Sequence, residues 1–374
     1  MVSSSKLIFQ SYSIKLESQR FKMADRHFIK VKGQSGDFPK IGLGTANLGE
    51  RTADAVCNAL KNGCTLIDAA LCYRNQKEVG EGIKMSGLSR NQFQVTTKVG
   101  FFPPKSDGVW MFNANNMKGG EKESIDLCLE QLGLDYVDLL LIHNPTASVP
   151  EYNTASCPHF FELFGNSGHP DAVKPEKLPG GEHIRPLILD SMLRKAKQEG
   201  ITKKESLEIR RQSWACLERA HKEGKAKMIG VSNYPAELLE EMKTYAEIMP
   251  AVNQIEYHPR FASPATYTKC KELGILLQSY GILNSMLIAN PAVRQRIDQI
   301  AKKNNTSAIQ TCIRWAVQNQ VCVIFRSGSK ENQLSNLASL QGPDLSSEDM
   351  AAINALHENY PYYWLPEASI QTLD

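Results

Sequence analysis

The sequence lacks the features that mark nucleic-acid-binding and membrane-spanning proteins. Its 374 residues carry a net charge of only +3, and no dense stripe of Lys and Arg is interleaved with aromatic residues. No apolar run approaches the roughly 20 residues that a helix needs to cross a bilayer. We therefore expect neither a nucleic-acid partner nor a membrane partner.

Paired cysteines and metal-ligand spacings are also missing. The nine cysteines are odd in number, scattered and without a CxxC pair, which is typical of a reduced protein inside the cell. Cys157 and His159, with His169 and His183 further on, loosely suggest metal ligands, but their spacing fits no zinc pattern. We expect no metal site.

A dinucleotide-binding fingerprint is absent as well. Gly42, Gly44 and Gly49 lie near the first predicted strand of the fold, but they lack the spacing of GxGxxG. The sequence therefore excludes a Rossmann domain.

Residues 1–22 differ in composition from the rest of the chain. Basic residues are interspersed with serines, and Glu17 is the only acid. This composition is typical of a mitochondrial transit peptide. The alternative, which we favour, is a disordered extension over 1–26 on a cytoplasmic protein, with a more ordinary amino terminus beginning at Met23.

Strand and helix patterns alternate through most of the remaining chain. Continuous apolar runs, as expected for strands covered on both faces, cover residues 41–43, 65–67, 94–98, 137–142, 226–231, 251–255, 275–279 and 321–325. Helices are expected over 54–62, 77–84, 122–132, 211–221, 236–244, 264–272, 292–302, 307–319 and 331–338. Eight strand–helix units predict one α/β domain over 27–374, a (β/α)8 TIM barrel. A β-hairpin over 27–40, with its turn at 33–36, is expected ahead of it.

One long insertion, at about 146–204 after the fourth strand, does not follow this pattern. It is rich in Pro and Gly and contains an apolar cluster, HFFELF, over 159–164. A connection of this length within a barrel is usually functional or mobile. We expect the apolar cluster to pack beside the barrel mouth as a lid, and the alternative is a decoration that covers an outer helix or a partner surface.

Asp68, Tyr73, Lys98 and His143 each fall where a predicted strand runs into a loop. In a barrel of this type the loops after the strands form the face on which chemistry takes place. An isolated Tyr hydroxyl has a pKa of about 10, too high for a good acid at neutral pH. A neighbouring ammonium stabilises a phenolate, a carboxylate keeps that ammonium charged and placed, and an imidazole can orient a substrate oxygen. Each residue alone could be structural, but together they form a proton-transfer set.

Several motifs, in order along the chain, resemble the aldo-keto reductase superfamily. They begin at Ile41 (IGLGT), Leu66 (LIDAA, continuing through Tyr73 to KEVG), Thr96 (TTK), Leu139 (LLLIHNP), Ile229 (IGVSNY) and Val252 (VNQIEYHP). The resemblance covers 38 to about 362, apart from most of the insertion. It implies an NAD(P)H-dependent enzyme that reduces aldehydes and ketones to alcohols by hydride transfer.

The resemblance also implies residue roles. Tyr73 would be the general acid, Lys98 and Asp68 would tune it, and His143 would orient the carbonyl. NADPH, with NADH possible, would lie across the barrel mouth. Its implied binding residues are Thr45, Asp68, Ser232, Asn233, Gln254, Tyr280, Arg326, Ser327 and Asn336. Among these, the serine and the two amides at 232, 233 and 254 would hold the nicotinamide carboxamide, and the tyrosine at 280 would stack on the nicotinamide ring.

The region expected to bind the adenosine end departs from the family pattern. Arg326 and Ser327 replace a Lys-Ser pair with the charge retained, and Asn336 matches. Asn332, however, stands where NADP-dependent members usually have an Arg. Because this loss removes a charge-assisted contact to phosphate, we expect weaker phosphate binding and leave the cofactor preference open.

Two further departures from the family pattern affect the expected substrate pocket. Ala46 and Asn144 stand where an aromatic residue and a Trp are common, which predicts a roomier or more polar pocket.

Two alternative functions stay open: a non-catalytic, cofactor-binding regulatory barrel and a lyase that uses Lys98 as a Schiff-base nucleophile. We expect a monomer acting on a small-molecule carbonyl substrate, whose identity the sequence leaves open.

Overall fold

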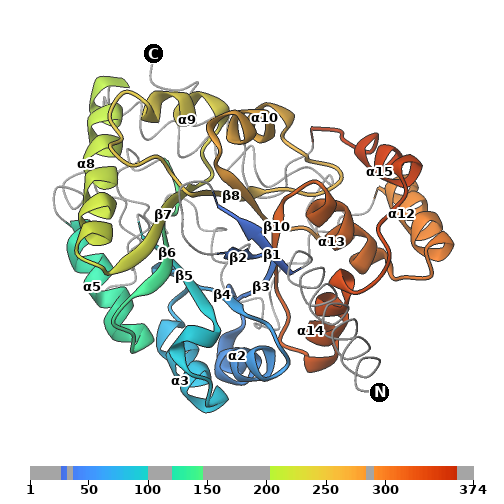
Figure 1. Cartoon of the computed structure of the whole chain (residues 1–374), viewed down its shortest axis with the longest axis horizontal. Helices are drawn as coiled ribbons and strands as arrows, with labels where there is room; N and C mark the ends of the chain where they lie inside the picture. Colours follow the sequence, from blue (N-terminus) through green and yellow to red (C-terminus); the bar gives the residue numbers. More distant parts are fainter. Residues whose placement is uncertain (1–26, 32–36, 100–119, 146–202, 284–289, 360–374) are drawn as a thin grey trace, which may run out of the picture.

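Eight parallel strands close into a barrel, with helices around its outside (Figure 1). The computed structural model describes residues 27–31, 37–99, 120–145, 203–283 and 290–359. The barrel strands are β3 (Ile41–Gly44), β4 (Leu66–Asp68), β5 (Gln94–Val99), β6 (Val137–Ile142), β7 (Ala226–Ser232), β8 (Val252–Glu256), β9 (Leu276–Tyr280) and β10 (Cys322–Phe325). Strand β10 pairs with both β9 and β3, so the sheet has no free edge. The predicted (β/α)8 barrel is confirmed.

The helices follow the strands as predicted, with two differences. They are α2 (Thr52–Lys61), α3 (Gln76–Ser86), α5 (Gly120–Leu132), α8 (Lys203–Lys222), α9 (Ala236–Met242), α10 (Pro264–Leu273), α12 (Pro291–Lys303), α13 (Ala308–Gln318), α14 (Lys330–Leu337) and α15 (Ser347–Asn354). Helix α8 begins eight residues before the predicted 211. Helix α15, which the sequence did not predict, follows the eighth strand–helix unit, with Ser346 capping its amino end.

Alternation along each strand divides the core into two clusters. Leu139 and Leu141 of β6 belong to the cluster inside the barrel, whereas Leu140 and Ile142 belong to the cluster between barrel and helices. Successive side chains of a strand point to opposite faces, so both sets are buried. Inside, a Cβ on Gly42 would lie 2.7 Å from Cγ of Leu66, which explains why glycine occupies that position.

A β-hairpin closes the end of the barrel at which the strands begin. Strands β1 (Phe28–Lys30) and β2 (Asp37–Pro39) pair antiparallel, and Phe38 is fully buried in the inner cluster. The side chain of Gln94, at the start of β5, donates to the carbonyl of Asp37 at 2.8 Å. The predicted hairpin is therefore confirmed, and the opposite end of the barrel carries the residues of interest.

Several predictions fall on residues outside the described ranges. These are the amino-terminal extension at 1–26, the hairpin turn at 33–36, the insertion at 146–202 with its expected lid, and the loose set of Cys157, His159, His169 and His183. Within the described ranges, no helix combines the length and apolar character needed to cross a bilayer.

Candidate active site

The residues expected to act in catalysis and cofactor binding lie where strands end, on one face of the barrel. Asp68, Ser232 and Tyr280 are the last residues of β4, β7 and β9, Lys98 is the last but one of β5, and Gln254 is the middle residue of β8. Thr45, His143, Asn233 and Arg326 directly follow β3, β6, β7 and β10. Since all the strands run in parallel, these ends share one rim.

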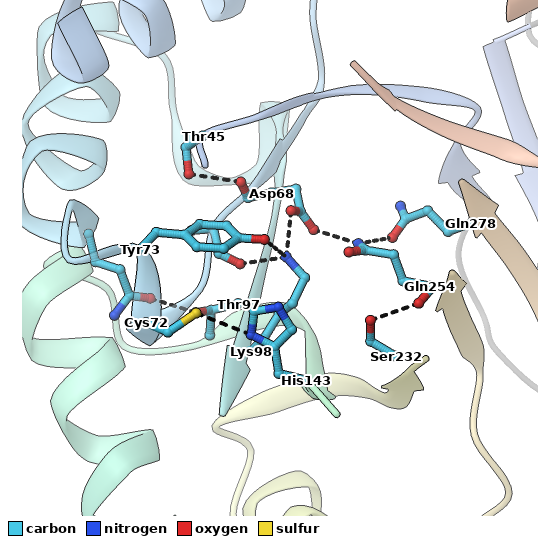
Figure 2. A network of polar contacts seen from close by, with 12 residues as sticks. Thr45, Asp68, Cys72, Tyr73, Thr97, Lys98, His143, Ser232, Gln254 and Gln278 are labelled. Carbon is cyan, nitrogen blue, oxygen red and sulfur yellow. Dashed lines mark hydrogen bonds and ion pairs between the residues drawn. The ribbon is translucent and has the colours of Figure 1, made fainter. Parts of the chain in front are cut away.

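Tyr73 is placed by a tight turn after β4. The 3-10 turn η2 spans Leu71–Tyr73, and the N–H of Tyr73 donates to the carbonyl of Ala70 at 3.1 Å. Arg74 then adopts a left-handed conformation with φ of 57°, which is uncommon for a residue with a Cβ. This sharp reversal ends the turn directly after Tyr73, whose ring lies over the end of β5 (Figure 2).

Lys98 connects Asp68 to the Tyr73 hydroxyl. Its side chain is fully buried, and Nζ lies 2.5 Å from Oδ1 of Asp68. The same ammonium donates to the carbonyl of Ala69 at 2.9 Å and to Oη of Tyr73 at 3.3 Å (Figure 2). A buried ammonium needs a paired anion and further acceptors, and these three contacts provide them. The arrangement fixes a positive charge beside the phenol oxygen.

His143 faces Tyr73 from the end of β6. The two rings are edge to face, with centroids 5.7 Å apart and planes at 82°. Burial, together with the charge of Lys98, holds the pKa of His143 well below its usual 6.5. The imidazole is therefore neutral at physiological pH and carries one N–H.

Cys72, the residue before Tyr73, contacts this imidazole. Its Sγ lies 3.4 Å from Nδ1 of His143 (Figure 2). Burial raises the pKa of the Cys72 thiol to about 12, so the group carries its hydrogen and can donate it. Sequence reasoning missed Cys72, because only the fold brings it to His143.

A second chain of hydrogen bonds leaves the other oxygen of Asp68. Nε2 of Gln254 donates to Oδ2 of Asp68 at 2.7 Å and to Oε1 of Gln278 at 2.7 Å (Figure 2). All three side chains are buried. Gln278 was likewise missed, and its inward position on β9 becomes visible only once the strand register is known.

Ser232 and Asn233 lie beside this chain of hydrogen bonds. The Ser232 hydroxyl donates to the carbonyl of Gln254 at 2.7 Å. Asn233 adopts a φ of 62°, and its amide donates to the backbone carbonyl of His143 at 2.9 Å. Tyr280 donates its hydroxyl hydrogen to Oδ1 of Asn233 at 2.7 Å. The amide of Asn233 thus connects the loop that carries His143 to the ring of Tyr280.

Thr45 is fixed at the start of the same rim. Its hydroxyl donates to the carbonyl of Asp68 at 2.9 Å, and its own carbonyl accepts from the Asn75 amide at 2.7 Å. Ala46, beside it, is half-buried. Asn144, the other position expected to widen the substrate pocket, is buried.

The residues expected at the adenosine end lie in a separate region, formed by the β10–α14 loop (residues 326–329) and helix α14. Arg326 is exposed there. The Ser327 hydroxyl donates to the carbonyl of Ser329 at 3.2 Å and accepts the N–H of Ser329 at 3.1 Å. The backbone N–H of Asn332 donates a hydrogen bond to the hydroxyl of Ser329, which caps α14. Asn336 is buried on α14.

The polar groups at the rim fit a nicotinamide carboxamide. Nε2 of Gln254 is used twice, whereas Oε1 of Gln254 receives no hydrogen bond from the described residues. That oxygen can accept an amide N–H, and the Ser232 hydroxyl and Asn233 amide lie nearby, at the end of the neighbouring strand β7 and directly after it. The buried Nε2 of Gln278 also has no acceptor in the described part of the chain, which leaves a donor available on the next strand.

Comparisons with known proteins agree on one family. The model described as "Aldo/keto reductase family" matches residues 40–358. Glyoxal reductase of Bacillus subtilis (strain 168) is 31% identical over 335 residues, covering 88% of this chain and 93% of that protein. D-galacturonate reductase of Hypocrea jecorina is 33% identical over 328 residues, covering 85% and 86%.

Solved structures show the same architecture. An aldo-keto reductase enzyme from a Medee basin deep-sea metagenome library superposes with a TM-score of 0.64 at 26% identity, covering 90% of this chain and 97% of that one. A Bombyx mori aldo-keto reductase in complex with NADP superposes with a TM-score of 0.65 at 22% identity, covering 91% and 95%. At that lower identity the second match supports the barrel fold alone.

Proposed function

This chain belongs to the aldo-keto reductase family, and from that premise we propose that it reduces the carbonyl group of a small aldehyde or ketone to an alcohol with NADPH. The observation that carries the proposal is the contact of the buried Lys98 ammonium with the Tyr73 hydroxyl at 3.3 Å. NADPH, when bound, supplies the hydride that adds to the carbonyl carbon, and the protein must supply the proton.

Tyr73 is the group proposed to give that proton. Lys98 donates to Oη of Tyr73, so the phenol oxygen is the acceptor in that contact, and the phenol's own hydrogen is the one proposed to pass to a carbonyl oxygen. When that proton leaves, a phenolate forms beside a fixed ammonium, and the attraction between them lowers the cost of the transfer. Asp68 holds the ammonium in place from its other side.

His143 is proposed to orient the substrate oxygen. The depressed pKa of His143 means that it acts as a neutral hydrogen-bond donor and does not compete with Tyr73 as a proton source. If Nδ1 accepts the Cys72 hydrogen, the ring hydrogen lies on Nε2. A carbonyl oxygen held by that N–H beside Oη of Tyr73 is in position to be protonated.

The nicotinamide end of the cofactor would be held by residues on or directly after three strands, β7, β8 and β9. Ser232, Asn233 and Gln254 would bind the carboxamide, with the free acceptor of Gln254 as the structural support. Tyr280 would pack against the nicotinamide ring from the end of β9. At the adenosine end, Arg326 and Ser327 would meet the phosphate, with Asn336 nearby on α14.

The lyase alternative fits the geometry poorly. A Schiff-base nucleophile needs an unshared electron pair on Nζ, but Nζ of Lys98 donates to Asp68, Ala69 and Tyr73. These three contacts suit an ammonium ion. The regulatory-barrel alternative is disfavoured because all four side chains of the proton-transfer set are present and in contact or close to one another.

The proposed substrate class is small and polar. The rim has Ala46 and Asn144 where the family often has aromatic residues, so fewer rings are available to cover an apolar substrate. Two relatives are named for glyoxal and for D-galacturonate reduction, and both names describe small polar carbonyl compounds.

The proposal is tested by following NADPH oxidation with purified protein and a carbonyl panel. The panel contains glyoxal, D-galacturonate, an aliphatic aldehyde and a bulky aromatic ketone, and NADH replaces NADPH in a parallel series. We expect turnover of the polar aldehydes with NADPH. Absence of turnover of every carbonyl, with NADPH binding intact by fluorescence titration, would favour the non-catalytic alternative.

A further inference from the structure

The β10–α14 loop, defined as residues 326–329, has a cationic neighbour from a distant part of the chain. A Cβ built on Gly328 would lie 3.2 Å from Cζ of Arg51 and 3.3 Å from its Nε and Nη1. The Arg51 guanidinium therefore lies against the backbone of this loop. Arg51 ends the short turn η1 (Gly49–Arg51), immediately before α2.

A buried side chain fixes α2 against the loop. Gln333, on α14, has no exposed surface, and its Nε2 donates to the carbonyl of Ala55 in α2 and to the carbonyl of Ser327, each at 3.0 Å. One amide thus connects the helix that follows Arg51 to the loop that contains Arg326. The approach of Arg51 to the loop is built into the packing of α2 and α14.

The charges around this loop are unbalanced. Neither Arg51 nor Arg326 forms an ion pair or side-chain hydrogen bond within the described residues, although other arginines, such as Arg90 and Arg210, do. The carboxylate of Glu331 accepts the hydroxyl of Ser329 at 2.7 Å, and Glu50 adjoins Arg51 in the sequence. Two positive charges at one loop, without an anionic side-chain partner among the described residues, favour the binding of an anion there.

The backbone of the loop adds donors to these charges. Helix α14 begins at Lys330 with Ser329 as its cap, and the first N–H groups of a helix favour a negative charge near them. Guanidinium groups form bidentate pairs with phosphate oxygens. The chemistry of the loop therefore suits a phosphate monoester.

We propose that Arg51 supplies a second positive charge for the 2′-phosphate of NADPH, in place of the cation that Asn332 lacks. The inference rests on the proposed function, because it assigns a residue to the cofactor of that reaction. It also changes the expectation from the sequence: phosphate binding is not weakened by Asn332, since a residue from the other side of the loop carries the charge. Arg51 then determines the preference for NADPH over NADH.

Equilibrium binding to the full-length protein tests this assignment without reference to turnover. Dissociation constants for NADPH and NADH are measured by fluorescence titration for wild type, Arg51→Ala, Arg51→Lys and Lys61→Ala. Lys61 is an exposed cation at the opposite end of α2 and serves as the matched control. We expect Arg51→Ala to raise the dissociation constant for NADPH about tenfold, which corresponds to one charge-assisted contact. The dissociation constant for NADH should stay within about twofold of the wild-type value. Arg51→Lys should recover part of the loss, and Lys61→Ala should change neither constant.

Gly328→Ala gives an independent variant in which the Arg51 charge is retained. The added Cβ would press on the guanidinium and force it to shift slightly, so NADPH binding should weaken in the wild-type background. In the Arg51→Ala background, Gly328→Ala should reduce NADPH affinity much less. Such a difference between the two backgrounds of a double-mutant cycle is expected when two residues are in direct contact. Equal costs in the two backgrounds would count against the proposal.

The outcomes separate this assignment from the proposed function. If wild type binds NADPH and Arg51→Ala leaves its ratio of NADPH to NADH affinity unchanged, the role of Arg51 is wrong and the reductase proposal stands. If wild type binds neither nucleotide, the reductase proposal itself fails, and the assignment of Arg51 fails with it.

Discussion

The thiol of Cys72 lies 3.4 Å from Nδ1 of His143, and the next residue in the chain is Tyr73. One short turn therefore places both the phenol and a contact that governs the imidazole facing it. A neutral imidazole has one N–H, and the partner of one nitrogen decides which nitrogen carries the hydrogen. If the thiol donates to Nδ1, the hydrogen of His143 lies on Nε2.

Replacing Cys72 tests whether it positions His143. Cys72→Ser keeps a donor near Nδ1 and should retain most activity. Cys72→Ala removes the donor and should lower kcat about fivefold, the equivalent of about 1 kcal/mol, with little change in NADPH affinity. Cys57→Ala, a buried thiol on α2, is the control for loss of a thiol elsewhere. Serine and alanine variants with the same kcat would show that the contact is only packing.

Replacing Tyr73 by Phe should remove the transferable proton and keep the ring. Because general acid catalysis contributes about two to four decades, carbonyl reduction should fall by that amount. NADPH affinity, measured by fluorescence titration, should stay within a few-fold of wild type. A Tyr73→Phe enzyme that reduces aldehydes at nearly the wild-type rate would rule out Tyr73 as the acid.

Breaking the buried ion pair should cost stability. Lys98→Met leaves the Asp68 carboxylate buried with Gln254 as its one remaining side-chain donor among the described residues. Removing one partner of a buried pair typically costs about 3–5 kcal/mol, which urea unfolding can measure. Lys222→Met, which removes an exposed pair with Glu247, should leave the unfolding midpoint almost unchanged. Similar midpoints for the two variants would contradict the buried pair.

The depressed pKa of His143 predicts a loss of stability in mild acid. The unfolded chain takes up a proton on this residue near pH 6.5, whereas burial prevents the folded chain from doing so. The contribution of His143 is therefore full above pH 6.5 and is lost as the pH falls below it, with a slope of at most about 1.4 kcal/mol per pH unit. Urea unfolding at several pH values should show a shallower acid dependence for His143→Gln. Identical profiles for wild type and variant would mean that His143 titrates normally in the fold.

The barrel strands could be predicted because their burial on both faces leaves a direct record in the sequence. The run over 137–142 is apolar apart from Asp138, and it forms β6 within the predicted bounds. Asp138 interrupts the run because its carboxylate pairs with Arg90 at 2.6 Å and accepts the N–H of Val95 at 2.9 Å. The partners that allow Asp138 to be buried in this strand become known only from the fold.

The helix starts were harder to predict where charge obscures periodicity. The first part of α8, KKESLEIR, is mostly charged, and the buried positions that the structure describes on this helix begin at Arg210, followed by Ser213 and Trp214. Helix α15 had a usable signal, since Ser346 precedes Asp349 by three residues and accepts its N–H at 3.2 Å. It was missed because the eight strand–helix units were already complete.

The site residues could be predicted singly, but their contacts could not. The sequence places Asp68 and Lys98 near the ends of strands and Tyr73 in the turn that follows, and the structure has all three at these places on one face. The contact of Cys72 with His143 depends on a turn and on a strand far along the chain. The approach of Arg51 to Gly328 joins the first and last barrel units, which no local pattern can indicate. The catalytic and cofactor-binding roles of all these residues stay predictions until the variants are measured.

Asp68 is bound through both oxygens, to Lys98 on one side and to Gln254 on the other. The two oxygens of this carboxylate therefore contact different halves of the rim, the half proposed to donate the proton and the half proposed to hold the nucleotide. Groups that share one anion influence each other reciprocally: whatever changes the hydrogen bonds of Gln254 alters the support of Lys98, and the reverse holds to the same extent. On the proposed roles, nucleotide binding and protonation of the acid would be coupled equilibria, so the pH dependence of NADPH affinity should report on an acid group that the nucleotide itself does not touch.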